Sequence, residues 1–210
     1  MKKETGTVYT PKNFDQLRGL TGLSDAQITE HLGLYAGYVK QVNSLVQELA
    51  EMKAERDESG KDFSLAEATR RFAYEYDGMV LHELYFANLK PGGDARPTDR
   101  QGLGRALAES FGSVDQWQQN FQAIGGMRGI GWVILYEDPA NGHLVNQWIT
   151  LHQDGIPARW KPILVMDVWE HAFMRDYKAS ERSKYIEAFF KNVDWTAVEH
   201  RLREAPARAA

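Results

Sequence analysis

The residues best suited to chemistry lie in segment 166–173, Met-Asp-Val-Trp-Glu-His-Ala-Phe. Asp167 and His171 are four residues apart, and a carboxylate and an imidazole at this spacing can bind one metal ion together. The apolar run 163–166 predicts a buried strand with Asp167 at its end, in dry surroundings. An ionised carboxylate there needs a compensating charge, which a metal ion or an Arg or Lys partner would supply. From these residues alone, a structural aspartate in a turn or ion pair is the competing interpretation.

Two long helices are predicted in the first half of the chain. Ser24-Asp-Ala-Gln27 is a capping-box pattern, and apolar residues recur at helical spacing from Ile28 to Met52. The polar stretch 55–61 ends this helix, and Ser64 caps a second one that runs to about Asn88. Segment 90–93, Lys-Pro-Gly-Gly, stops the second helix. We therefore expect a helical hairpin domain over residues 1–90.

The second half, residues 91–210, has a mixed pattern. Helices are predicted over about 100–110, 113–124 with Ser113 as cap, 185–193 with Ser180 as cap, and 195–203. Segments 132–136 and 144–149 read as strands joined by a turn at Asn141-Gly142, and a third strand ends at Asp167. The predicted fold class is α+β: a long N-terminal α-helical hairpin, then a C-terminal domain with a three-stranded antiparallel sheet, expected as a meander, packed on helices.

Composition restricts the class of protein. Of the 210 residues, 43% are hydrophobic and 11% aromatic, which is ample for a packed core. The apolar runs are far shorter than the roughly 20 residues of a membrane helix, and the first residues show no export signal. We expect a soluble, cytoplasmic protein. With no cysteine, any metal must be held by His and Asp or Glu. A net charge of −4 argues against nucleic acid as a partner.

Five segments carry a resemblance to a known family, and they occur in that family's order along the chain. Segment 167–172, Asp-Val-Trp-Glu-His-Ala, resembles the C-terminal signature of the iron/manganese superoxide dismutases, and further matching segments are 88–91, 110–117, 129–132 and 185–195. The resemblance extends from about Phe14 to Arg203. It implies that Asp167 and His171 both bind a metal ion, and that His82 is the family's second ligand histidine. Without the resemblance, His82 on an apolar helix face would read as a core histidine.

The first metal ligand is ambiguous by one residue. The family has a histidine eight residues before the tyrosine of a Tyr-Val pair, which here is Tyr38-Val39. Glu30 lies eight residues before Tyr38, and His31 lies seven before it. Helical geometry lets His31 reach the face of Tyr38 if the helix is regular and not bulged. The alternatives are therefore His31, Glu30 or no ligand from this helix.

The set His31, His82, Asp167 and His171 would hold one iron or manganese ion per subunit with an open position. The resemblance implies an antioxidant oxidoreductase, a superoxide dismutase that converts superoxide to dioxygen and hydrogen peroxide by redox cycling of that ion. Selection among metals would come from geometry and supply, because zinc and copper bind such donors at least as tightly.

Proton delivery and subunit contacts are also implied by the resemblance. Tyr38 is the candidate at the mouth of the site, and either His152 or Gln153 would contact the bound solvent. Gly78, four residues before His82, leaves space for that side chain. Glu170 resembles a residue that bonds to the partner's metal-binding histidine, which implies a homodimer through the Glu170/His171 region. Trp132 and Trp169 would wall the cavity.

Several positions depart from the family pattern. Leu34 stands where the family has a histidine, Phe173 where it has a gateway tyrosine, and Phe86 and Ile134 replace tryptophans. The loss of polar groups from the entrance predicts reduced activity. Two alternatives follow: a non-catalytic binding or structural protein on the same scaffold, and a related metal-dependent oxidoreductase acting on another oxygen species.

Overall fold

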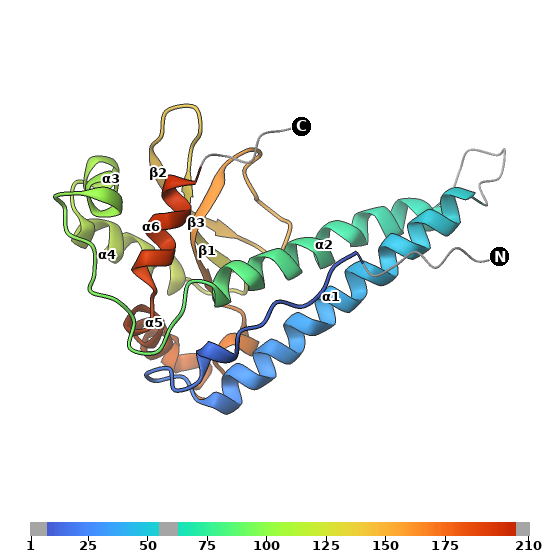
Figure 1. Cartoon of the computed structure of the whole chain (residues 1–210), viewed down its shortest axis with the longest axis horizontal. Coiled ribbons are helices and arrows are strands. Elements are labelled where there is room, and N and C mark those ends of the chain that lie inside the picture. The colour runs from blue at the N-terminus through green and yellow to red at the C-terminus, as the bar shows by residue number, and fades with distance from the viewer. Residues whose placement is uncertain (1–7, 55–62, 205–210) are drawn as a thin grey trace.

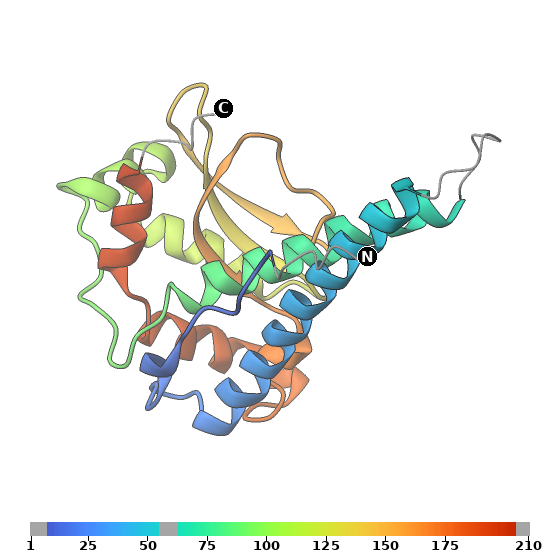
Figure 2. The ribbon, with the colours of Figure 1, turned by 45° about the vertical axis from the view of Figure 1, so that its right-hand side comes forward.

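A helical hairpin projects from a body built of a small sheet and shorter helices (Figures 1 and 2). The computed structural model describes residues 8–54 and 63–204. The hairpin consists of α1 (Asp25–Ala54) and α2 (Phe63–Phe86) and follows a 3-10 turn, η1 (Asp15–Leu17). In the body lie α3 (Gly102–Phe111), α4 (Val114–Gly125), β1 (Trp132–Glu137), β2 (Leu144–Ile149), β3 (Lys161–Asp167), η2 (Glu170–Ala172), η3 (Ala179–Glu181), α5 (Arg182–Lys191) and α6 (Trp195–Arg203). The predicted α+β class is confirmed.

Helix α1 starts where its capping pattern predicts. The Ser24 hydroxyl accepts a hydrogen bond from the Gln27 backbone N–H (3.0 Å). The helix then stays α-helical from Asp25 to Ala54, without a π turn. One face is buried against α2 and the body, along Ile28, Tyr35, Val39, Val42 and Leu45. The predicted end at 55–61 lies outside the described residues.

Helix α2 is anchored to the sheet at its C-terminal end. It ends at Phe86, two residues before the predicted boundary, and Ser64 lies inside it and not at its cap. The buried Asn88 side chain donates to the Val165 carbonyl of β3 (2.6 Å). Its oxygen accepts a hydrogen bond from the Arg201 guanidinium of α6 (2.7 Å). The end of α2 is thereby fixed to the strand that carries Asp167.

The sheet has the order β2-β1-β3, with both pairs antiparallel. The expected meander is therefore wrong, since β1 is central and the chain crosses over between β2 and β3. Strand β1 is buried along Trp132–Tyr136, as a central strand must be, whereas the middle of β2 is half-exposed at an edge. Trp132 pairs with both Ile149 and Asp167, so the crossover segment 150–160 begins at the level of Asp167.

The remaining helices follow the predicted order. Ser113 caps α4 by accepting from the Gln116 N–H (3.1 Å), as predicted. Ser180 is not a cap, because it lies in η3, and α5 begins at Arg182. In residues 8–54 and 63–204, no helix is long and apolar enough to cross a membrane.

Candidate metal centre

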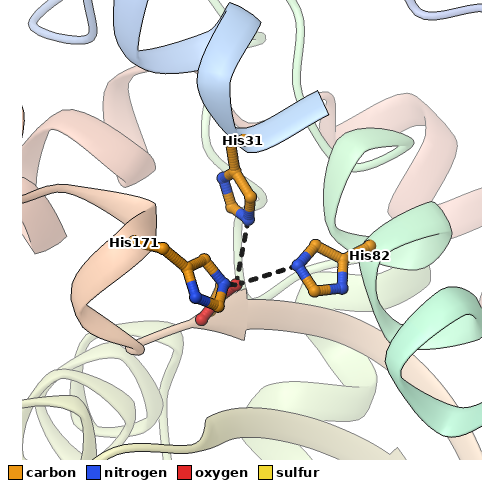
Figure 3. Close-up of side chains that lie close together, drawn as sticks. His31, His82 and His171 are labelled. Atoms are coloured by element: carbon orange, nitrogen blue, oxygen red, sulfur yellow. Dashed lines mark hydrogen bonds and ion pairs between the residues drawn. The ribbon is translucent and has the colours of Figure 1, made fainter. Parts of the chain in front are cut away.

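Four elements bring three histidines to one carboxylate (Figure 3). His31 comes from α1, His82 from α2, His171 from η2, and Asp167 is the last residue of β3. One nitrogen of each imidazole and one oxygen of Asp167 all lie within 4.8 Å of one another. The residues are separated by up to 140 positions in the sequence, so the tertiary fold alone makes this cluster.

The two oxygens of the Asp167 carboxylate have different partners. Oδ1 accepts a hydrogen bond from the Trp169 backbone N–H (2.8 Å), which fixes the carboxylate plane. Oδ2 faces the three imidazoles, at 3.1 Å from His31 Nε2, 3.0 Å from His171 Nε2 and 3.7 Å from His82 Nε2. All four side chains are fully buried except that of His171, which is 21% exposed.

Electrostatics keeps the carboxylate charged and two imidazoles neutral. Burial alone would raise the pKa of Asp167, but the charge of His171 and the hydrogen bonds with His171 and His31 hold it well below its usual range. Burial lowers the pKa of His31, and lowers that of His82 well below its ordinary value. Neutral imidazole and ionised carboxylate are the states in which these side chains bind metals.

The hydrogen bonding of His82 tests whether the cluster fits a metal ion. Its Nδ1 lies 2.6 Å from the Gly78 carbonyl, which can only accept, so Nδ1 carries the proton. The Nε2 lone pair then points into the cluster, buried and without a hydrogen-bond partner in the described chain. A metal ion satisfies this orphaned acceptor, and a backbone carbonyl is a usual outer partner of a metal-binding histidine. Three imidazoles and one carboxylate therefore fit iron or manganese.

The structure brings His31, and not Glu30, into the cluster. Because α1 has no bulge, His31 and Tyr38 share its inward face. Glu30 is 58% exposed and pairs with Arg175 on the surface.

His152, and not Gln153, contacts Tyr38. His152 is fully buried, and its Nε2 lies 2.7 Å from the Tyr38 hydroxyl. The Trp132 indole N–H donates to His152 Nδ1 (3.1 Å). An indole N–H can only donate, so in neutral His152 the proton is on Nε2 and is donated to the Tyr38 oxygen. This leaves the Tyr38 O–H free to donate to another group.

Aromatic rings and one glycine define the walls around these groups. The Trp132 ring packs edge-on against His82 at 5.0 Å, and Trp169 stacks on His152 at 4.9 Å. A Cβ at Gly78 would lie 2.7 Å from the Tyr38 ring. The absence of a side chain at Gly78 therefore allows the Tyr38 ring to pack against α2.

The surface beside His171 is hollowed. This hollow is lined by Glu30, Gly33, Leu34, Glu170, His171, Met174 and Arg175. Glu170 is exposed there, next to His171, and Leu34 and Met174 are 45% and 48% exposed. Phe173 is instead fully buried and stacks on Tyr185. The expectation that Phe173 lines the entrance is therefore wrong.

Some supporting residues were not predicted. The Tyr185 hydroxyl donates to the Asp167 carbonyl (2.5 Å). Gln27 donates to the His171 carbonyl (2.7 Å) and accepts from the Arg175 N–H (3.1 Å), which ties the His171 segment to α1. In the sequence, Tyr185 and Gln27 look like ordinary helix residues, and only the tertiary contacts reveal these roles.

Known proteins resemble the chain over almost its full length. A family model described as iron/manganese superoxide dismutases, C-terminal domain, matches residues 99–201. Superoxide dismutase [Fe] of Aquifex pyrophilus is 35% identical over 93% of this chain and 91% of that protein. Superoxide dismutase [Fe] of Cupriavidus metallidurans is 35% identical over 89% and 91%, respectively. Superoxide dismutase [Mn] of Mycolicibacterium smegmatis is 32% identical over 88% and 87%.

Proposed function

We infer how the residues of this chain carry out the reaction of its family, since the chain belongs to the iron/manganese superoxide dismutases. The protein is an oxidoreductase that converts superoxide to dioxygen and hydrogen peroxide with one bound iron or manganese ion. We propose His31, His82, Asp167 and His171 as the ligands. The observation that carries this assignment is the convergence of three imidazoles on Asp167 Oδ2.

An iron or manganese ion held by these four residues would supply the redox chemistry, the exchange of single electrons with superoxide. The chain's own residues hold the charge balance around it. One buried carboxylate and three imidazoles place a single negative charge beside the ion, which suits an ion that alternates between divalent and trivalent states. The dry surroundings strengthen these interactions.

Protons are handled, in this proposal, by Tyr38 and His152. Burial raises the pKa of Tyr38 above its usual range, so the phenol stays protonated and can donate. Burial lowers the pKa of His152 to about 4, so the imidazole is neutral near pH 7. His152 then donates to the Tyr38 oxygen, which leaves the Tyr38 proton available for the peroxide that forms. Gln153 has no such contact with Tyr38, and we propose His152 as the positioning group.

The hollow beside His171 supports a homodimer. We propose that a second copy covers this surface, with Glu170 of each copy accepting a hydrogen bond from His171 of the partner. The exposed Leu34 and Met174 would then be buried between the copies. Two domains, 1–90 and 91–210, and a cytoplasmic location are part of the same proposal.

Metal analysis together with superoxide consumption tests the function. We expect purified protein to contain one iron or manganese ion per subunit and to consume superoxide. Protein that stays empty and inert after reconstitution with both metals would leave only the non-catalytic alternative, which no observation of the structure favours. Metal-loaded protein that turns over peroxide and not superoxide would indicate a related oxidoreductase.

A further inference from the structure

An N-terminal strap, residues 8–14, lies along both helices of the hairpin (Figure 1). Its first residues are fixed to α1 by one side chain. Asn43 Oδ1 accepts hydrogen bonds from the backbone N–H groups of Val8 (3.1 Å) and Tyr9 (3.0 Å). Asn43 Nδ2 donates to the Tyr9 carbonyl (2.8 Å). These three hydrogen bonds fix the first two residues of the strap against α1.

The other end of the strap joins both helices through one hydrogen-bonded cluster. The Lys12 backbone N–H donates to the Tyr35 hydroxyl of α1 (2.9 Å), and that hydroxyl donates to Glu83 Oε1 of α2 (2.9 Å). The Lys12 ammonium pairs with Glu83 Oε2 (2.5 Å). Three chain segments thus meet at the Glu83 carboxylate.

This cluster lies directly behind two of the proposed metal ligands. Tyr35 follows His31 by one helical turn, and Glu83 follows His82 in sequence. Phe14 of the strap packs on Phe86 (5.2 Å between ring centroids), and Phe86 packs on His31 (4.9 Å). The cluster therefore fixes α1 against α2 at the level where His31 and His82 must converge.

The Tyr35–Glu83 hydrogen bond is the stronger part of the cluster. Tyr35 is 1% exposed and the Glu83 side chain 15% exposed, so a buried phenol donates to a charged acceptor with little competition from water. Lys12 is 63% exposed, and solvent weakens its ion pair.

We propose that Tyr35 and Glu83, with Lys12 as a lesser member, are positioning residues for the metal centre. They touch neither superoxide nor the ion, and act by setting the distance between the helices that carry His31 and His82. This inference rests on the proposed function.

The test measures metal retention in the loaded protein. Tyr35→Phe removes the hydroxyl and keeps the ring, and we expect release of the metal to a chelator to be about tenfold faster. The rise in melting temperature on metal loading should shrink as well. Glu83→Gln keeps a neutral acceptor for Tyr35 and should release metal more slowly than Glu83→Leu, which should lose metal as fast as Tyr35→Phe. Lys12→Met should have a smaller effect.

Asn146→Ala is the matched control, because it removes a part-buried hydrogen bond from Trp117 (3.0 Å) between α4 and β2, together with the Asn146 hydrogen bond to Asn120 (2.8 Å). We expect it to lower the melting temperatures of empty and loaded protein equally and to leave metal release unchanged. The inference is overturned if Tyr35→Phe behaves as this control does. If Tyr35→Phe does not fold, equal metal release from Glu83→Gln and Glu83→Leu overturns it. Wild-type protein that takes up no metal would instead refute the proposed function.

Discussion

Asp167 organises the centre because its oxygens have separate partners. Oδ1 is held by the Trp169 N–H, and Oδ2 faces three imidazoles. The sequence could identify Asp167 and His171 as a candidate pair from their spacing. It could not decide between Glu30 and His31, since that choice depends on whether α1 is bulged. The regular helix places His31, and not Glu30, in the cluster.

Replacing His31 tests that choice. His31→Ala should lower metal affinity at least about 100-fold, because it removes a proposed ligand and opens a buried polar gap. Glu30→Ala, at an exposed position, should keep metal and activity within about twofold. Metal content after dialysis and superoxide consumption measure both variants. Equal metal retention in the two variants would refute His31 as a ligand.

The direction of the hydrogen bonds through His152 gives a second prediction. Trp132→Phe removes the only donor to His152 Nδ1 seen in the described residues. The His152 proton can then move to Nδ1, and His152 Nε2 can accept a hydrogen bond from the Tyr38 hydroxyl. We expect about a tenfold loss of activity with metal content unchanged. His152→Gln should keep most activity, because a glutamine oxygen can accept from Trp132 while its amide donates to Tyr38. Rate measurements in which His152→Gln is as impaired as Trp132→Phe would contradict this account.

The depressed histidine pKa values predict a pH dependence of stability. Burial lowers the pKa of His152 to about 4, so between pH 6.5 and 4 the unfolded chain binds more protons than the folded one. His152 therefore contributes about 3 kcal/mol to the free energy of unfolding above pH 6.5, and this contribution is lost as the pH falls toward 4. His31 and His82 act in the same direction.

Denaturant unfolding of metal-free protein between pH 4 and 7 measures this effect. The His152→Gln variant should show a shallower decline in the free energy of unfolding than wild type. Identical slopes would show that His152 is not buried in its neutral form.

At the scale of elements, patterns along the chain predicted the helices and strands well, and the sheet order poorly. The caps Ser24 and Ser113 act as their motifs indicate. The meander expectation failed because strand periodicity does not state which strand is central. The full burial of Trp132–Tyr136 decides that, and it depends on α4 and the neighbouring strands. The crossover that results carries His152 to Tyr38.

Two helical glycines make a matched pair for testing the packing of α2 on α1. A Cβ at Gly78 would lie 2.7 Å from the Tyr38 ring and 3.2 Å from His152 Cδ2, whereas a Cβ at Gly37 meets nothing within 4 Å. Gly78→Ala should therefore destabilise the protein by about 1–3 kcal/mol and impair activity. Gly37→Ala should stabilise it by about 0.5–1 kcal/mol through helix propensity. Chemical denaturation checks both, and a stabilising Gly78→Ala would contradict the packing described.

At the scale of the whole molecule, the proposed dimer completes the surroundings of His171. Its imidazole is the one proposed ligand side chain with exposed surface, 21%, and it faces the hollow that Glu170 lines. The resemblance of segment 167–172 pointed to this face. The sequence did not reveal that Phe173 is buried while Met174 reaches the surface, since that depends on the turn after η2.

Loss of the Glu170 carboxylate should weaken the dimer. Glu170→Ala removes the proposed bond to the partner's imidazole, and we expect the dimer dissociation constant to rise about tenfold or more. Glu187→Ala, an equal charge change at an exposed position of α5, should leave this constant unchanged. Sedimentation over a concentration series distinguishes them. A wild-type monomer, or an unaltered Glu170→Ala dimer, would refute this interface.

The most direct test of the central claim is anomalous diffraction from crystals of metal-loaded protein at the iron and manganese absorption edges. The account predicts one anomalous peak per subunit, within bonding distance of His31 Nε2, His82 Nε2, His171 Nε2 and Asp167 Oδ2. A fully loaded crystal with its only peak elsewhere, or with one of these four side chains turned away from the ion, would contradict it.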